Sequence, residues 1–540
     1  MYNPPIIAQP APVAPNLPPP MVAQPPLRPP TSYTNCCNIF FYIVILILEV
    51  GLIALFYTVR YPAYPWGVYR VGDINWYYYL MFEYKIMADL SIMMLVGYGF
   101  LVSYLRFHRW MSLTLTFFIV MISLQYYILF YGFWTASCNL AWFSGINMTI
   151  TTIIMAQKAA ITVLISIGAL IGKVDFFQMT IFALFELIVY SLNEAIIFRG
   201  VGVLDQGGSM YIHCFGALFG IFASWIYSPK SNMINNPNNR ASYGSATVTF
   251  IGTFFLWIFF PSFNAYNYHH SYLNPSNYYT YMSPIYMDVF PHGYNSLRIP
   301  HYNYDVYSPL NYNLAFLGIS NTYWALLTST AVAFWMSMIV KGGKFSIDHI
   351  LNATLAGGVM IGACCDMFAF PYPALLVGAF AGIVSVLSFQ YLSRCLEAML
   401  IFDTRGVFHL HFIPGMFGCI ASAIAVATMA NVPPTYDPPV NYFGNPLLTF
   451  TMMPRSRLGY IQGGYQIIGG LISMGMGIAG GLIMGWILRI WRCMNLPEDT
   501  FGDHIFFKMI QENQLNGPAP VFTDKMMNPP PLVVQPGVLY

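Results

Sequence analysis

The sequence predicts an all-α polytopic membrane protein. Of the 540 residues, 57% are hydrophobic and only 8% are charged, whereas charged residues make up about 25% of a typical soluble domain. A membrane-spanning helix needs about 20 mostly apolar residues, and the chain contains about twelve such stretches. The net charge of +2 comes from dispersed lysines and arginines, so no basic patch indicates binding to nucleic acid.

The predicted spans follow one another through the middle of the chain. They fall at residues 38–58, 88–106, 110–135, 148–171, 174–198, 207–228, 243–263, 315–340, 347–367, 371–392, 409–430 and 460–490. Residues 1–30 lack the apolar core of a cleavable signal, so we expect 38–58 to remain as an extra leading helix. Lysines and arginines are more frequent in the connections on the side of the two termini, which favours cytoplasmic tails.

The composition divides the chain into a transmembrane domain, 38–492, and two proline-rich tails, 1–37 and 493–540. Proline cannot donate a backbone hydrogen bond and favours extended conformations, so we expect the tails to be ordered only by docking on other proteins. The segment 264–314 is dense in Tyr, Asn and Pro. Its many aromatic residues argue against disorder and predict an outer cap that can also contact a partner.

Motifs for metal, nucleotide or covalent chemistry are missing from the sequence. The nine cysteines lack the Cys and His spacing of a zinc site. No glycine-rich phosphate loop follows a strand pattern, and no nucleophile stands beside a base. We therefore expect no metal, no cofactor and no enzymatic activity.

Two histidines lie inside apolar stretches, His213 in GGSMYIHCFGALFG and His411 in FHLHFIPGMFGCIASAIAVA. Ionisable side chains are costly at membrane depth and commonly mark a substrate path. If 38–58 is an extra helix, His213 falls on the fifth of the next ten helices and His411 on the tenth. This spacing predicts two inverted five-helix repeats, with the span 460–490 as an additional C-terminal helix.

Several strings of this sequence resemble the Rh branch of the ammonium transporter (Amt/Rh) superfamily. They are MLVGYGFLVSYL, SLNEAIIF, DQGGSMYIHCFGALFG, IGTFFLWIFFPSFNA, ISNTYWALLTSTAV, LNATLAGGVMIGA and DTRGVFHLHFIPGMFG, in that order within residues 38–492. The resemblance implies a homotrimer in which each subunit has a narrow apolar pore. It implies a small neutral gas as substrate, ammonia first and carbon dioxide as a second candidate.

The resemblance also implies roles for individual residues. His213 and His411 match the family's paired pore histidines, Phe255 in GTFFLW matches an aromatic residue at the outer constriction, and Asp205 matches the acidic residue ahead of the first histidine. Where the family has Ala-Asp-Phe in the third helix, this chain has Ala-Gln-Lys, ending at Lys158. A cation there opposes ammonium recruitment by Coulomb repulsion.

Each of these residues also has a structural interpretation. The histidines could simply join two helices by a buried hydrogen bond, although their equivalent positions and the glycines beside them favour pore lining. Asp205 could orient carbonyl groups at the outer vestibule or cap the start of the following helix. Lys158 could extend to the outer surface, pair with Glu194 or Asp205, or obstruct the mouth.

The function we predict from sequence is a passive channel for ammonia or ammonium in a multi-pass membrane protein, with the plasma membrane favoured over an organellar one. A pore that strips a proton avoids the large cost of desolvating an ion, and imidazole, with a pKa near neutrality, suits that task. The alternative is a non-conducting Rh-like structural subunit of a larger membrane assembly. Lys158, the proline-rich tails and the aromatic insertion favour it.

Overall fold

The computed structural model describes residues 33–61, 74–138, 146–228, 236, 238–265, 309–368, 370–429, 459–490 and 502–503. Nearly all of both proline-rich tails and of the insertion 264–314 lies outside the described residues, so the expectations for those segments stay predictions. The chain divides into two compact units, Met1–Val50 and Gly51–Tyr540. The first contains most of helix α1 (Tyr33–Leu55), and the second contains all the other described elements.

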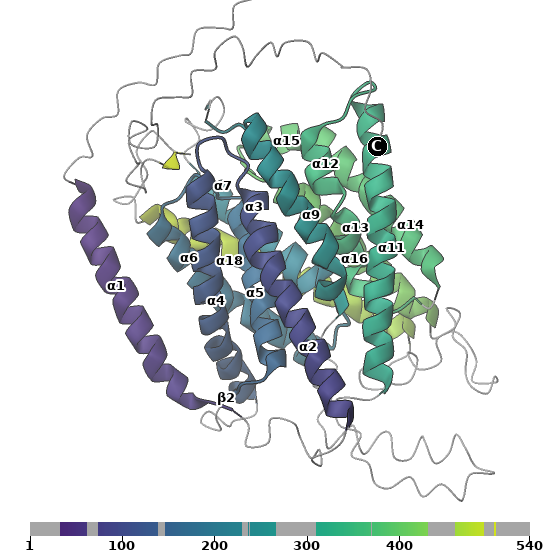
Figure 1. Cartoon of the computed structure of the whole chain (residues 1–540), viewed down its shortest axis with the longest axis horizontal. Helices are drawn as coiled ribbons and strands as arrows, with labels where there is room; N and C mark the ends of the chain where they lie inside the picture. Colours follow the sequence, from purple (N-terminus) through teal and green to yellow (C-terminus); the bar gives the residue numbers. More distant parts are fainter. Residues whose placement is uncertain are drawn as a thin grey trace, which may run out of the picture. The chain divides into compact units, whose positions relative to one another are not determined.

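The second unit is a bundle of long helices, several of them visible side by side in Figure 1. The α-helices of this unit are α2 (Ile74–Ile92), α3 (Gly99–Val102), α4 (Arg109–Cys138), α5 (Ile150–Gly168), α6 (Phe176–Glu194), α7 (Phe215–Tyr227), α9 (Tyr243–Ala265), α11 (Pro309–Val340), α12 (Ile347–Ala353), α13 (Ala356–Ile361), α14 (Pro371–Leu387), α15 (Ser393–Ala398), α16 (Ile413–Met429) and α18 (Gly459–Ile490). Among them α11 packs along α14, and α18 packs along α7 and α16.

Short π-helical turns continue several of these helices, and other elements are brief. The π turns are η2 (Met93–Tyr98), η3 (Ala195–Val201), η4 (Ser209–Cys214), η7 (Ser388–Leu392) and η8 (Phe408–Phe412). Two 3₁₀ turns, η1 (Phe56–Thr58) and η6 (Gly362–Cys364), and two parallel two-residue strands, β1 (Val59–Arg60) and β2 (Ile146–Asn147), complete the described elements. Val59 is opposite Ile146, and Arg60 is opposite Asn147.

The all-α membrane architecture predicted from sequence is confirmed. Eleven helical segments of the described chain are long and apolar enough to cross a membrane. They are Met81–Val102, Arg109–Trp134, Ile150–Gly168, Phe176–Val201, Ser209–Tyr227, Tyr243–Ala265, Ala315–Val340, Ile347–Cys364, Pro371–Ala398, Phe408–Thr428 and Gly459–Ile490. The expected first span, 38–58, coincides with α1, but its described apolar part, Ile43–Thr58, is shorter than these eleven.

Side-chain caps determine where several helices begin. Thr149 and Thr152 form a capping box at the start of α5, and Asp175 and Gln178 form another at the start of α6. Each box satisfies backbone N–H groups that have no partner within the helix. The start of α4 is capped from far along the chain, because the carboxylate of Asp503 accepts hydrogen bonds from the backbone N–H groups of 109–111 at 2.8–3.0 Å.

Helix α9 shows how each span separates its lipid-facing side from its packed side. Ile251, Phe254 and Ile258 follow helical spacing and are 40–59% exposed, as expected for a face that meets hydrocarbon rather than water. Leu256 and Phe260 lie on the opposite side and are 2% exposed. This rotation of the helix decides which of its aromatic rings can reach the interior of the bundle.

Candidate functional site

The two histidines singled out in the sequence meet in the middle of the bundle. The Nδ1 atoms of His213, on η4, and His411, on η8, lie 3.0 Å apart. Their rings are nearly parallel, at 13°, with centroids 5.1 Å apart, and both residues are buried. A hydrogen bond between two Nδ1 atoms requires one donor and one acceptor, so at least one imidazole of the pair is neutral.

Both histidines follow the same local arrangement of an aspartate and a glycine, which is called the frame below. Asp205, Gly208 and His213 have the spacing of Asp403, Gly406 and His411. Both glycines have positive φ, +77° and +72°, a conformation that glycine adopts without steric cost. The histidine therefore stands five residues after a left-handed glycine in each half of the chain, a repeat that our sequence analysis missed because it considered only the glycines that follow each histidine.

The aspartates of this frame hold the start of each π turn. The Oδ2 atom of Asp205 accepts hydrogen bonds from the backbone N–H groups of Met210 at 2.8 Å and Tyr211 at 3.1 Å. Asp403 Oδ2 accepts one from the N–H of Phe408 at 2.8 Å. These contacts support the capping role that the sequence left open for Asp205. Burial raises the pKa of the Asp205 carboxyl to about 6, although the backbone donors oppose that shift.

Helical geometry at the histidines also departs from the ordinary α-helix. The backbone N–H of His213 donates to the carbonyl of Gly208, five residues earlier, at 2.9 Å. Such π turns are rare and often lie at functional sites. Here they begin just after the aspartate and the left-handed glycine, and the apolar periodicity of the sequence could not reveal them.

Aromatic rings and a lysine lie on one side of the histidine pair. The ring of Phe263 is 5.7 Å from that of His213, and Phe260 is 6.0 Å from it. Lys158 Nζ lies 5.2 Å from the centroid of Phe263 and donates to the carbonyl of Gln206 at 3.0 Å. Lys158 is buried, so it does not extend to the outer surface. Asp205 and Glu194 both act on it electrostatically.

Among the aromatic residues of α9, Phe263 lies beside His213 and Lys158, and the outer-constriction role expected for Phe255 stays a prediction. Phe255 is half-buried, and its ring stacks on Phe259 of the same helix with centroids 6.3 Å apart. The two candidates are eight residues apart on α9, a rise of about 12 Å. Sequence could have found Phe263 in the string PSFNA, because it continues the buried face that contains Phe260.

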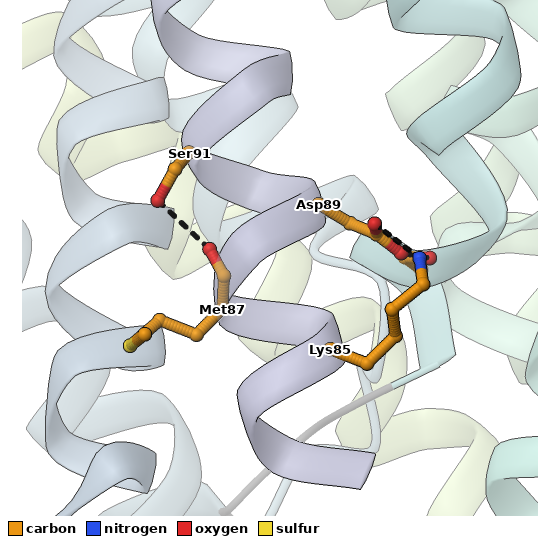
Figure 2. A network of polar contacts seen from close by, with 5 residues as sticks. Lys85, Met87, Asp89 and Ser91 are labelled. Carbon is orange, nitrogen blue, oxygen red and sulfur yellow. Dashed lines mark hydrogen bonds and ion pairs between the residues drawn. The ribbon is translucent and has the colours of Figure 1, made fainter. Parts of the chain in front are cut away.

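A polar network on α2 positions the segments that carry Lys158 and Phe263. Figure 2 shows Lys85 and Asp89 paired one turn apart on α2, with Ser91 donating to the carbonyl of Met87. Gln157, beside Lys158, donates to that carbonyl at 2.9 Å and to Ser91 at 2.8 Å. Two further contacts tie α9 to the same turn of α2. Ser262, beside Phe263, donates to Asp89 at 2.6 Å, and Lys85 Nζ is 6.0 Å from the centroid of Phe259.

A small cavity lies on the other side of the histidine pair. His411 and Arg405 both border it, together with Tyr98, Leu164, Asn352 and Leu410. Arg405 was not among the residues singled out from the sequence. The structure places its buried guanidinium against the ring of Tyr104, 4.1 Å from the ring centroid.

These contacts form a continuous series through the bundle, from Lys158 through Phe263 and His213 to His411 and then to the cavity beside Arg405. On helix α5, Lys158 precedes the cavity-lining Gly168 by ten residues, a rise of about 15 Å. The described residues contain no cluster of three or more His, Cys, Asp or Glu side chains that could hold a metal ion.

Comparison with known proteins places these observations in a family. The family model described as Ammonium Transporter Family matches residues 70–285 and 307–505. The ammonium transporter Rh type C of Rattus norvegicus is 32% identical over 490 residues, covering 87% of this chain and 86% of the relative. The ammonium transporter Rh type B of Danio rerio is 30% identical over 486 residues, covering 87% and 93%.

Solved structures share the fold. The Rh50 protein of Nitrosomonas europaea superposes with a TM-score of 0.60 at 24% identity, covering 82% of this chain and 96% of that one. The Mep2 protein of Saccharomyces cerevisiae superposes with a TM-score of 0.54 at 16% identity, covering 79% and 92%.

Proposed function

This chain belongs to the ammonium transporter family, in its Rh branch, and from that premise we propose that it conducts ammonia along the series from Lys158 to the cavity beside Arg405. The chain is an integral multi-pass membrane protein. In the proposal it works as a homotrimer, with the plasma membrane as the expected site and with one conduit in each subunit.

The observation that carries the proposal is the buried hydrogen bond between His213 and His411, with Phe260 and Phe263 beside it. An intact ammonium ion loses many kcal/mol of hydration in such surroundings, whereas ammonia loses little. The pair supplies polar ring atoms where carbon otherwise dominates. His213 Nε2 has no hydrogen-bond partner among the described residues, so it is available to a passing solute.

Proton removal follows from the same geometry. Ammonium approaching the pair must give up its proton to enter the apolar part of the series, and the neutral molecule can then exchange hydrogen bonds with the imidazoles. Carbon dioxide is the second candidate because it is also small and neutral, but it neither needs deprotonation nor donates a hydrogen bond. Histidine substitution should therefore affect ammonia more than carbon dioxide.

The test is ammonia entry into vesicles that contain the purified protein, followed by stopped-flow fluorescence of a pH dye. Ammonia entry raises the internal pH. We expect His213→Leu and His411→Leu to change the rate severalfold while the protein stays folded. His409→Gln is the matched control, because His409 is buried on the same π turn but contacts Ser388 and Ser393 instead of His213. A double leucine variant with the wild-type rate would contradict the proposal.

Lys158 favours the second candidate function, a non-conducting Rh-like structural subunit. Its ammonium group lies on Phe263, directly beside the histidine pair, where it opposes any cation that approaches. We expect flux to rise in Lys158→Phe and to be unchanged in Lys341→Phe, since Lys341 is exposed. Flux unchanged by Lys158→Phe would remove the obstructing role. Vesicles of the wild type and of Lys158→Phe that both match protein-free vesicles would favour the structural subunit.

A further inference from the structure

Arg405 is a buried cation whose hydrogen-bonding groups are not satisfied by the described part of the chain. Its exposed fraction is 6%. Two of its side-chain nitrogens, Nε and Nη2, are buried and have no hydrogen-bond acceptor there. The ring of Tyr104 lies against the guanidinium, but the face of a ring satisfies hydrogen bonds poorly. Leaving a buried charge without a partner costs several kcal/mol, so an acceptor from outside the chain is expected.

The cavity that Arg405 shares with His411 has room for such an acceptor. Its free volume is about that of one water molecule. The size suits one water molecule, accommodates a chloride-sized ion only with a small outward shift of the lining side chains, and excludes bulky polyatomic anions. Most of the wall is apolar, with Leu164 and Leu410 among its residues.

The nearby carboxylates do not neutralise Arg405 by direct contact. Asp348 and Asp403 act on it electrostatically, yet no ion pair joins Arg405 to either one in the described chain. Asp348 accepts the hydroxyl of Tyr104 at 2.7 Å, and Asp403 accepts the backbone N–H of Phe408. Lys173 in turn acts on Asp403. The charges of Arg405 and Lys173 balance those of the two aspartates. A bound anion is therefore not repelled by a net negative charge.

We propose that Arg405 binds a small monovalent anion, of the size of chloride, in the cavity on the far side of His411. The anion accepts the guanidinium hydrogen bonds that the protein leaves open. Water is the competing occupant, because Asn352 Oδ1, also without a partner in the described chain, borders the same cavity and needs a donor rather than an acceptor.

The anion site has a consequence for the conduit, and this consequence rests on the proposed function. A chloride ion beside His411 offsets the fixed charge of Arg405 at that end of the series. Passage of ammonia, and release of ammonium after reprotonation, should then be faster when the site is filled. Binding itself does not depend on whether the protein conducts.

Binding is tested on the full-length protein purified in detergent, using sodium chloride against sodium gluconate at equal ionic strength. A ligand that binds only the folded state raises its thermal stability in a saturable way. We expect saturable stabilisation by chloride, one radiolabelled chloride per subunit at equilibrium, and at least tenfold weaker binding in Arg405→Gln. Arg394→Gln is the matched control because Arg394 is exposed and should bind chloride as the wild type does.

The results of these measurements distinguish chloride from water as the occupant of the cavity. Equal stability in chloride and gluconate, with no bound radiolabel, means that water fills the cavity and overturns the proposal. If Arg405→Gln fails to fold, Arg405→Lys decides, because it keeps the charge but lacks the planar fork, and undiminished affinity there overturns the role of the guanidinium. Vesicle flux in chloride and gluconate then tests the coupling, and equal flux with intact binding removes the coupling while the site stands.

Discussion

The loops 205–213 and 403–411 share an aspartate, a glycine and a histidine at the same spacing, and the third position is one of those at which they differ. In both, an aspartate accepts backbone hydrogen bonds, a glycine has positive φ, and a histidine follows five residues later. The third position is Gly207 in one loop and Arg405 in the other. A Cβ atom at Gly207 would lie 2.3 Å from Asn264 Oδ1 and 2.6 Å from the Cα of Gly362. The shared aspartate and glycine position the histidine in each loop. The residues packed around a loop decide which side chain fits at its third position.

The buried cations on the two sides of the histidine pair also come from different parts of the chain. On the side of the first loop, Lys158 comes from the neighbouring helix α5 and donates to the loop carbonyl of Gln206. On the side of the second loop, the cation is Arg405 itself, which borders a cavity and has two nitrogens without a hydrogen-bond partner in the described chain. A lysine ammonium carries three donors on one rotatable group, whereas a guanidinium presents its donors in a rigid planar fork. In the described chain, the second arrangement lies beside a cavity.

The largest effect should come from filling the position where the loops differ. Gly207→Ala forces a methyl group against the backbone of Gly362, which cannot move aside as a flexible side chain can. Overpacking of this kind costs about 1–3 kcal/mol and occasionally more, and we expect the upper end. Thermal unfolding of the purified variant, followed by tryptophan fluorescence, measures this. Wild-type stability of Gly207→Ala would show that the loop is looser than its contacts indicate.

The next effect tests whether the two frames are equivalent. Gly208→Ala and Gly406→Ala each place a Cβ atom on a residue with positive φ, which costs about 1–2 kcal/mol. We expect similar losses in the free energy of unfolding, with added crowding from Ile212 in the first loop and from the ring of Phe389 in the second. A cost at only one of the two sites would break the equivalence of the halves.

Substitution of the two aspartates should cost different amounts of stability in the two loops. Replacing a helix-capping aspartate by alanine costs about 0.5–2 kcal/mol. We expect Asp205→Ala to cost more than Asp403→Ala, because Asp205 Oδ2 accepts hydrogen bonds from the backbone N–H groups of Met210 and Tyr211, whereas Asp403 Oδ2 accepts one from Phe408. Unfolding in denaturant measures both. The opposite order would mean that the aspartates act through contacts other than the caps.

The dependence of the free energy of unfolding on pH should reflect the burial of Asp205. Because burial raises its pKa in the folded state to about 6, the folded protein binds this proton more tightly than the unfolded chain does. The contribution of Asp205 to stability is therefore present at low pH and is lost as pH rises from about 3.9 to the folded pKa. Asp205→Asn should remove this decline. Parallel curves of stability against pH for the wild type and Asp205→Asn would contradict this role of Asp205.

The smallest effect should come from giving the second loop the residue of the first. Arg405→Gly removes a buried cation, two of whose nitrogens lack hydrogen-bond acceptors in the described chain, so the loss of its contact with Tyr104 is offset by relief of the desolvation cost. We expect a change of less than about 1 kcal/mol in stability measured without chloride. A loss as large as that of Gly207→Ala would show that Arg405 is essential to packing.

Sequence predicted the spans well and the details of the site less completely. The apolar runs locate helices such as Gly459–Ile490 within a residue or two because hydrocarbon demands long, uninterrupted apolar segments. The second span begins seven residues before its expected start at 88, since Lys85 and Asp89 lower its hydropathy yet pair with each other. Phe263 was not singled out from the sequence, although it lies three residues after Phe260 on the buried face of α9.

The sequence alone determined the helical membrane fold and drew attention to His213, His411 and Lys158, because apolar length and ionisable residues within it are local properties of the chain. Only the tertiary structure decided that the two imidazoles meet at 3.0 Å, that Phe263 lies between Lys158 and His213, and that Arg405 borders a cavity. Each of these depends on the rotation and close approach of helices far apart in sequence, which packing of the whole bundle sets.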